Sequence, residues 1–165
     1  MIIGQEVLNT LFKLKDGQAL FNELIELEET GKYEHIGIGK TWDALHFLLT
    51  GITAGEPIYD NKLSEAIVGV HNFHFFKADD PFITGTENSE LGEIIDAMEA
   101  IDFKEILNSF DYEEKTQAKN DIYPKGIWGN PREALKEELN KDFENILKLY
   151  KKAKEKGHHI IVSIF

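Results

Sequence analysis

One segment decides how this chain folds: Lys40-Thr41-Trp42-Asp43-Ala44-Leu45-His46-Phe47-Leu48-Leu49-Thr50-Gly51. At about 100° per residue, its apolar side chains cover most of a helix surface, which predicts a helix that starts at Trp42. Thr41 suits the N-cap position, and Gly51 suits a left-handed residue that ends the helix. A helix that is apolar nearly all round is typical of a buried position, so we expect this segment to form the core helix.

Three polar side chains interrupt this apolar surface. Asp43, His46 and Thr50 fall together in a narrow notch of the predicted helix. One interpretation makes Asp43 and His46 a catalytic pair, in which the carboxylate orients an imidazole that acts as a general base. The other interpretation has them satisfy backbone groups of neighbouring loops, as polar groups at the edge of a core must find partners. We favour the second, because residues three apart on a helix can touch without any catalytic role.

The composition limits the classes of function. The 165 residues include 30 acidic and 18 basic side chains, which give a formal net charge of −12. A negative surface repels nucleic acid and anionic membranes, so we expect neither as a partner, whereas a basic protein partner or a cationic ligand is permitted. Acidity also serves simply to keep a protein in solution. The chain has no cysteine, which excludes disulfides, a thiolate nucleophile and cysteine-ligated zinc.

The sequence carries no targeting signal. No apolar run approaches the ~20 residues of a membrane-spanning helix. The N-terminus lacks the basic region and the apolar core of a signal peptide. We therefore expect a cytoplasmic protein, and no pattern in the chain sets its oligomeric state.

The remaining apolar patterns predict a helix-rich α+β fold, formed by residues 1–165 as a single domain. We expect two N-terminal helices that end near Gly17 and Gly31, and a charged helical segment over residues 110–120. The other helix starts that we predict are at Asp60 or Asn61, at Thr86, at Asp102, and at Asn130-Pro131 for a long helix that ends near Gly157.

Two segments are predicted to be strands of a small mixed sheet. A short strand is expected over residues 81–84, and a terminal strand over residues 158–165. The terminal strand is almost continuously apolar, which indicates a position inside the sheet rather than at its edge.

Aromatic and histidine side chains extend the set of candidate ligand-binding residues to Trp42, His46, His71, Tyr123 and Trp128. Tyr123 and Trp128 lie in an irregular segment, where bulky side chains more often pin a loop to the core than stack on a ligand. We therefore expect the polar notch of the core helix to hold the loops of Tyr123 and Trp128 in place.

A metal site is a further alternative. His71 and His74 have the His-x-x-His spacing that can place two imidazoles on one ion, and His46 could supply a third ligand. No acidic ligand stands at a diagnostic spacing, so we predict neither a metal nor another cofactor.

The same residues support a resemblance to a known family. Segment 40–51 resembles the signature Lys-x-Trp-x-x-Leu-His-Phe-Leu-Leu-Thr-Gly of the YfbM-like family, a bacterial domain of unknown function with the number 1877. Three further matches follow in the family's order, namely residues 63–69, residues 82–84 with the helix after them, and Ile122-Tyr123-Pro124 with Ile127-Trp128 before the long helix and the final strand. The resemblance covers about residues 36–165 and implies an α+β fold, but it brings no established activity and no catalytic residues.

The N-terminal part departs from this family pattern. Members of the family open with a Gly-Met-x-Gly strand, whereas Met1 here stands almost at the first predicted helix. We therefore treat residues 1–35 as a divergent helical part, and the sheet edge that the family's first strand would fill stays open.

Two classes of function follow. The first is an acidic binding or interaction protein, for example a toxin-neutralising, immunity-like partner of a basic effector, with the long helix and the acidic segment 23–29 as candidate surfaces. The alternative is a small-molecule-binding protein or a hydrolase-type enzyme that uses a cleft at Asp43 and His46. We favour the first class, because no serine elbow and no cysteine supplies a nucleophile.

Overall fold

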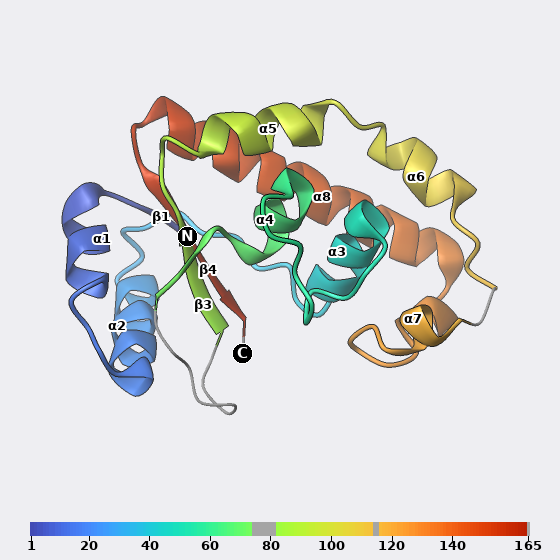
Figure 1. The fold of residues 1–165 in the computed structure, drawn as a ribbon, viewed down its shortest axis with the longest axis horizontal. Coiled ribbons are helices and arrows are strands. Elements are labelled where there is room, and N and C mark those ends of the chain that lie inside the picture. The colour runs from blue at the N-terminus through green and yellow to red at the C-terminus, as the bar shows by residue number, and fades with distance from the viewer. Residues whose placement is uncertain (74–81, 114–115, 165) are drawn as a thin grey trace. The chain divides into compact units, whose positions relative to one another are not determined.

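The computed structural model describes residues 1–73, 82–113 and 116–164. These residues combine helices with a four-stranded antiparallel sheet, which confirms the α+β class (Figure 1). They group into two compact units. The first comprises Met1–Ile36, Gly69–Gly92 and Leu149–Phe165, and the second comprises Gly37–Val68 and Glu93–Lys148. Within the described residues, no helix has the length and the apolar character needed to cross a membrane.

The first unit contains the sheet. Its strand order is β1 (Ile2–Ile3), β4 (His159–Ile164), β3 (Phe82–Thr86) and β2 (His71–Asn72). The C-terminal strand β4 therefore lies inside the sheet, as its apolar run predicts. The expectation of a mixed sheet is wrong, since all three pairings are antiparallel. Apolar runs indicate that a strand is buried, but they carry no information on the direction of pairing.

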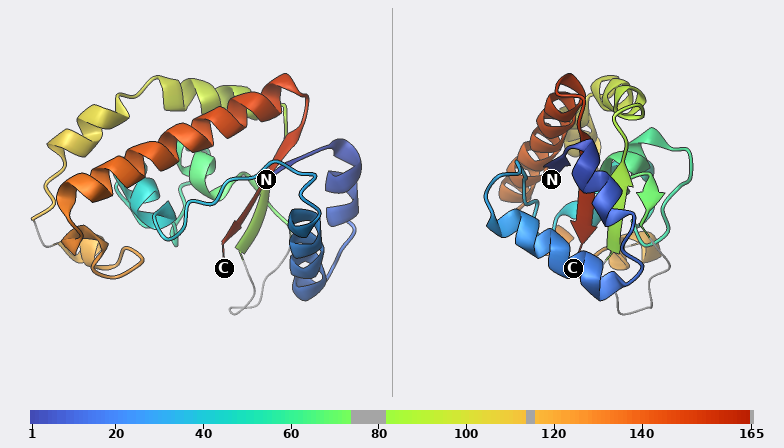
Figure 2. Two further views of the ribbon diagram at one scale, coloured as in Figure 1. Left: turned by 180° about the vertical axis from the view of Figure 1, so that it is seen from behind. Right: turned by 90° about the vertical axis from the view of Figure 1, so that its left-hand side faces the viewer.

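Strand β1 pairs with β4 and fills the sheet edge that the sequence left open. It has two residues, both buried, and it leads directly into helix α1 (Gln5–Leu11). Helix α2 (Gly17–Glu29) follows, with the Asp16 carboxylate accepting a hydrogen bond from the Ala19 amide at 2.9 Å. Both N-terminal helices are thus present, and Figure 2 shows them on the same side of the sheet.

The core of the first unit joins these two helices to the sheet. Its fully enclosed members are Ile3, Leu8, Leu11, Leu20, Leu24, Phe73, Ile83 and Ile161. Strand residues alternate between faces, so Ile83 and Ile161 point towards α1 and α2 from neighbouring strands. Burial of such apolar side chains supplies most of the favourable free energy of folding.

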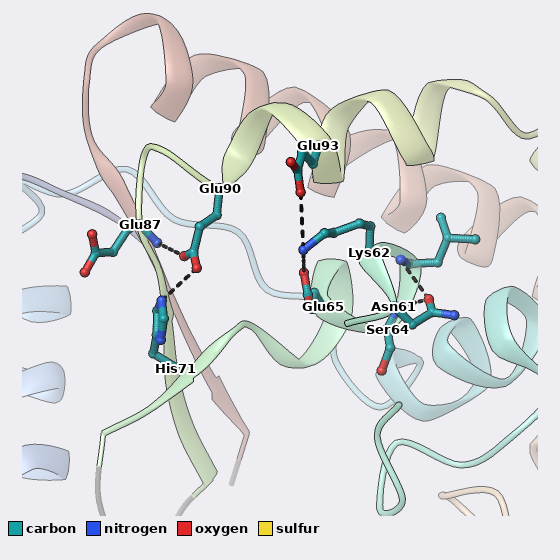
Figure 3. Close-up of polar contacts among 9 residues, drawn as sticks. Asn61, Lys62, Ser64, Glu65, His71, Glu87, Glu90 and Glu93 are labelled. Atoms are coloured by element: carbon teal, nitrogen blue, oxygen red, sulfur yellow. Dashed lines mark hydrogen bonds and ion pairs between the residues drawn. The ribbon is translucent and has the colours of Figure 1, made fainter. Parts of the chain in front are cut away.

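The second unit is organised around helix α3 (Trp42–Thr50). Its bounds are those that the sequence predicts, and Gly51 has the left-handed φ of 83° that lets the helix end there. Ala44 and Leu45 are fully buried. Helix α4 (Lys62–Val68) starts at the predicted cap, where the Asn61 side-chain oxygen accepts from the amides of Leu63 and Ser64 at 3.0 Å each (Figure 3).

The second unit also contains α6 (Phe103–Ser109), the short helix α7 (Gln117–Asn120) and the 3-10 turn Ile127–Gly129. Asp102 caps α6 as predicted, by accepting from the Glu105 amide at 3.0 Å. The helical segment expected over residues 110–120 is largely absent, since only α7 is helical in its described part. Phe110 is extended and ends α6, and its ring packs on Trp128 with ring centroids 4.8 Å apart.

Two helices have residues in both units. Helix α5 (Leu91–Glu99) does not start at Thr86, which is instead the last residue of β3, so that predicted cap is wrong. A β-branched residue suits a strand as well as a helix cap, and the local sequence does not separate the two. Helix α8 (Arg132–Glu155) is the predicted long helix, with 24 residues, and Gly157 after it has a left-handed φ of 65°.

Candidate functional site

Asp43 lies in the first turn of α3, and its side chain is only 1% exposed. Its carboxylate accepts hydrogen bonds from two backbone amides, those of Ala54 and Tyr123, each at 2.7 Å. It also accepts from the Thr53 hydroxyl at 3.0 Å. One buried carboxylate therefore connects α3 to the loop that follows it and to a loop far along the chain.

His46 lies one turn further along α3 and is completely buried. Its Nδ1 is 2.9 Å from the Ile52 carbonyl oxygen, and its Nε2 is 2.7 Å from Ser64 Oγ. A carbonyl oxygen can only accept, so Nδ1 carries the proton and Nε2 accepts from the Ser64 hydroxyl. Ser64 Oγ in turn accepts from the Ile58 amide at 3.2 Å. Both ring nitrogens are therefore satisfied within the protein, in the neutral form of the ring.

These bonds define two anchored loops, residues 52–60 and residues 121–129. Loop 52–60 is held near its start by Asp43 and His46 and near its end by Ser64. Loop 121–129 is held by Asp43 through the Tyr123 amide. Thr50, the third polar residue of the notch, donates to the His46 carbonyl oxygen at 2.7 Å, a hydrogen bond within the last turn of α3.

Thr41 occupies the N-cap position of α3, but its side chain does not cap the helix. Its hydroxyl oxygen lies 2.6 Å from the Ile38 carbonyl oxygen and 2.6 Å from a carboxylate oxygen of Asp142 on α8. Burial of the Asp142 carboxyl raises its pKa above the ordinary value. The Thr41 side chain therefore contacts the segment before α3 and helix α8, rather than the first amides of α3.

The serine next to His46 is a residue that the sequence analysis did not single out. A serine hydroxyl on an imidazole nitrogen is the arrangement that activates a nucleophile in hydrolases. Here, however, Ser64 is fully buried, and its oxygen also receives an amide hydrogen bond. Asp43 does not orient His46, because the two side chains bond to different partners. The arrangement stabilises loops and leaves no group exposed for a substrate.

The aromatic candidates divide into Trp128, which packs inside the second unit, and the stacked pair Trp42 and Tyr123, of which only Tyr123 is exposed. The Trp128 indole donates to the Lys119 carbonyl oxygen at 3.2 Å, and its ring packs on Phe110 and Phe47. Trp42 stacks on Tyr123 with ring centroids 5.8 Å apart, and Tyr123 stays 46% exposed. Trp128 thus pins its loop to the second unit, while the ring of Tyr123 faces solvent.

The remaining histidine candidates are not part of this group of contacts. His71 belongs to the first unit, on strand β2, where its Nε2 is 2.8 Å from a carboxylate oxygen of Glu90 (Figure 3). Glu90 also accepts from the Glu87 amide at 2.8 Å. His74 lies outside the described residues. Across the described part of the chain, no three histidine, aspartate or glutamate side chains are grouped as a metal ion would require.

Burial lowers the pKa of His46 below its ordinary value, because the charged ring would have to leave water. The unfolded chain then binds a proton near pH 6.5 that the folded chain does not accept until a lower pH. The free energy of unfolding therefore decreases as the pH falls below about 6.5 towards the folded-state pKa.

A pH series of urea unfolding tests this consequence. We expect the stability of the protein to fall between pH 7 and pH 5 with a slope from His46 of at most about 1.4 kcal/mol per pH unit. In His46→Asn the slope is smaller, whatever the absolute stability of the variant. Burial also lowers the pKa of His159, so His159→Gln reduces the slope in the same direction. Equal slopes in the wild type and in His46→Asn would contradict the neutral buried imidazole.

Comparisons with known proteins add a family and one relative. The family model "Domain of unknown function (DUF1877)" matches residues 3–163, and so includes most of the N-terminal part in which the motifs gave no resemblance. Protein YfbM of Escherichia coli strain K12 is 32% identical over 130 residues, which are 78% of this chain and 75% of that protein. The crystal structure of YfbM from Escherichia coli, described as a protein of unknown function, has a TM-score of 0.73 at 27% identity over 99% of this chain and 96% of that one.

Proposed function

This chain belongs to the family described as a domain of unknown function (DUF1877), and on that premise we propose that it is a binding protein whose acidic surface engages a basic protein partner. The observation that carries the proposal is the complete use of Asp43 and His46 in structural hydrogen bonds, with both side chains buried. A small-molecule or hydrolase role for these two residues would require both anchored loops to detach first. A binding role needs only the surface that the loops present.

The charge of the chain supports this proposal. A net charge of −12 attracts a basic partner, accelerates its association and repels a second copy of the same chain. Among the exposed carboxylates, Glu26, Glu28 and Glu29 lie on α2 and Glu137 and Glu138 on α8. In its specific form, the proposal is that this protein is a toxin-neutralising, immunity-like protein. It would act by covering a basic effector rather than by catalysing a reaction.

Affinity capture from the native host tests the proposed function. The intact protein is immobilised and exposed to lysate at about 50 mM and about 500 mM salt, since screening shortens the reach of surface charges. We expect one basic protein to be enriched at low salt and depleted at high salt. That protein is then purified, and its binding is measured by calorimetry across the same salt range.

Three results would overturn the proposal. They are a lysate that yields no enriched protein at low salt, a partner that is acidic, and a purified partner whose affinity does not depend on salt. The immunity-like form adds a growth assay. Expression of the partner alone should arrest growth, and co-expression of this protein should restore it, while a partner that is harmless alone would exclude this form.

A further inference from the structure

In the described part of the chain, the exposed large apolar side chains are concentrated on the anchored loops. Among the described residues, four large hydrophobic side chains are exposed, and three of them are Ile58, Tyr59 and Tyr123. Single exposed apolar residues are normal on a protein surface, but a concentration of them marks a contact site. Both loops belong to the second unit, and the Asp43 carboxylate bonds to both.

Tyr59 is the extreme member of this set, with 91% of its surface exposed. The backbone on either side of Tyr59 is nevertheless held in place by hydrogen bonds. The amide of Ile58 donates to the buried Ser64 hydroxyl, and Asn61 caps helix α4. Asp60 between them has a left-handed φ of 59°, a conformation that aspartate adopts more readily than most residues. The backbone therefore holds Tyr59 outward at a defined place.

Tyr123 is presented in the same way on the other loop. Its amide is bonded to the Asp43 carboxylate, and one face of its ring stacks on Trp42. Aromatic side chains on a preformed backbone lose little conformational entropy on binding, which is why tyrosine and tryptophan dominate binding hot spots. The two exposed tyrosines are thus preorganised, Tyr59 through the contacts of Ser64 and Asn61 and Tyr123 through Asp43.

The charges on this surface indicate what it binds. Along the chain, the exposed acidic residues Glu56 and Asp60 flank Tyr59 on loop 52–60. Loop 121–129 adds the exposed Asp121 and Lys125, so acidic residues are in excess on the two loops. The face of a tyrosine ring attracts a guanidinium or ammonium group, and nearby carboxylates add to that attraction. A second copy of this chain would bring another charge of −12 to the same place, which disfavours self-association.

We propose that the anchored loops, residues 52–60 and 121–129, form the docking surface for an arginine-bearing segment of a protein partner, with Tyr59 and Tyr123 as its aromatic contacts. This proposal rests on the proposed function and gives it a location, in place of the acidic faces of α2 and α8. Arginine fits better than lysine because its planar guanidinium can stack on an aromatic ring and still bond to a carboxylate.

The test uses the intact protein and a short arginine–glycine peptide, with the same peptide carrying neutral citrulline as its control. Binding is followed by NMR titration at low salt. We expect the backbone signals of the anchored loops to shift with the arginine peptide and not with the citrulline peptide. Tyr59→Ser and Tyr59→Leu should each weaken binding about tenfold, while Tyr59→Phe, which keeps the ring face, should bind like the wild type.

A matched pair of charge variants distinguishes the effect of a carboxylate on the anchored loops from the effect of the overall net charge. Glu56→Gln on loop 52–60 and Glu29→Gln on α2 remove one exposed carboxylate each. We expect Glu56→Gln to weaken the binding of the arginine peptide by about threefold or more, and Glu29→Gln to have a smaller effect. The side chains at these three positions make none of the hydrogen bonds that anchor the loops, so folding should be preserved, as amide spectra can verify.

The other outcomes overturn the docking surface. Peptide binding that shifts α2 or α8 and is unaffected by Tyr59→Ser would move the site elsewhere and leave the proposed function intact. Sedimentation that shows a dimer of the wild type, lost in Tyr59→Ser, would assign the surface to self-association. Absence of any arginine-peptide binding would overturn the docking surface alone, because salt-dependent capture of a basic partner tests the proposed function separately.

Discussion

Replacement of Asp43 by alanine should lower the free energy of unfolding by about 3–5 kcal/mol. The carboxylate accepts from the Ala54 amide, the Tyr123 amide and the Thr53 hydroxyl. Without it, the buried Ala54 amide and the part-buried Tyr123 amide lose their partners, and an unsatisfied buried donor costs about 1–3 kcal/mol. The loss is large compared with the total stability of a typical domain, about 5–15 kcal/mol.

Urea unfolding of the wild type and of Asp43→Ala measures this loss directly. Asp102→Ala is the matched control, since Asp102 is exposed and its carboxylate serves one amide at the start of α6. That cap is worth about 1 kcal/mol. A catalytic role for Asp43 without a structural one predicts the reverse order, with Asp43→Ala no less stable than Asp102→Ala.

Replacement of His46 by alanine should have an effect of similar size, about 3–4 kcal/mol. The imidazole is completely buried, so its removal leaves a cavity inside the second unit. The Ile52 carbonyl oxygen and the Ser64 hydroxyl also lose the ring nitrogens to which they bond. This one substitution removes a direct contact at the start of loop 52–60 and the partner of Ser64, which holds the end of the loop.

A double-mutant cycle with Ser64→Ala gives the sharper form of this prediction. Ser64→Ala alone should cost about 1–2 kcal/mol, because the Ile58 amide and His46 Nε2 each lose a partner. The effects of the two substitutions should combine with a coupling energy of about 1 kcal/mol or more, since the residues share one hydrogen bond. Strict additivity would show that the 2.7 Å contact between them contributes nothing to stability.

Local sequence patterns are sufficient for the central helix. Its apolar surface and Gly51 predict the bounds that the structure has, because both the start and the stop are set by residues within the segment. Asn61 and Asp102 are predicted for the same reason, as each side chain caps amides two or three residues further on. Thr86 shows the limit of this kind of inference, since the pairing of β3 with β4 outweighs a local capping preference.

The partners of the polar notch depend on long-range contacts. Asp43 reaches Tyr123, which is 80 residues away, and His46 reaches Ser64 on the next helix. The expectation that the notch holds the loop of Tyr123 follows from the need of buried polar groups for partners. The identity of Ser64 could not follow, because the face of α4 that meets α3 is set by tertiary packing. The one indication in the sequence was that Ser64 lies within residues 63–69, the first of the three further matches to the family.

The most direct test of the account is amide hydrogen exchange at Ala54 and Tyr123. The central claim is that the Asp43 carboxylate orders both anchored loops, so these two loop amides should exchange slowly in the wild type. In Asp43→Asn, a milder change than alanine, both should exchange about 10–100 times faster, while the amide of Ile161 in β4 keeps its rate. The account would be contradicted if Ala54 and Tyr123 exchanged at the rate of free loop amides in the wild type, or if Asp43→Asn left their rates unchanged.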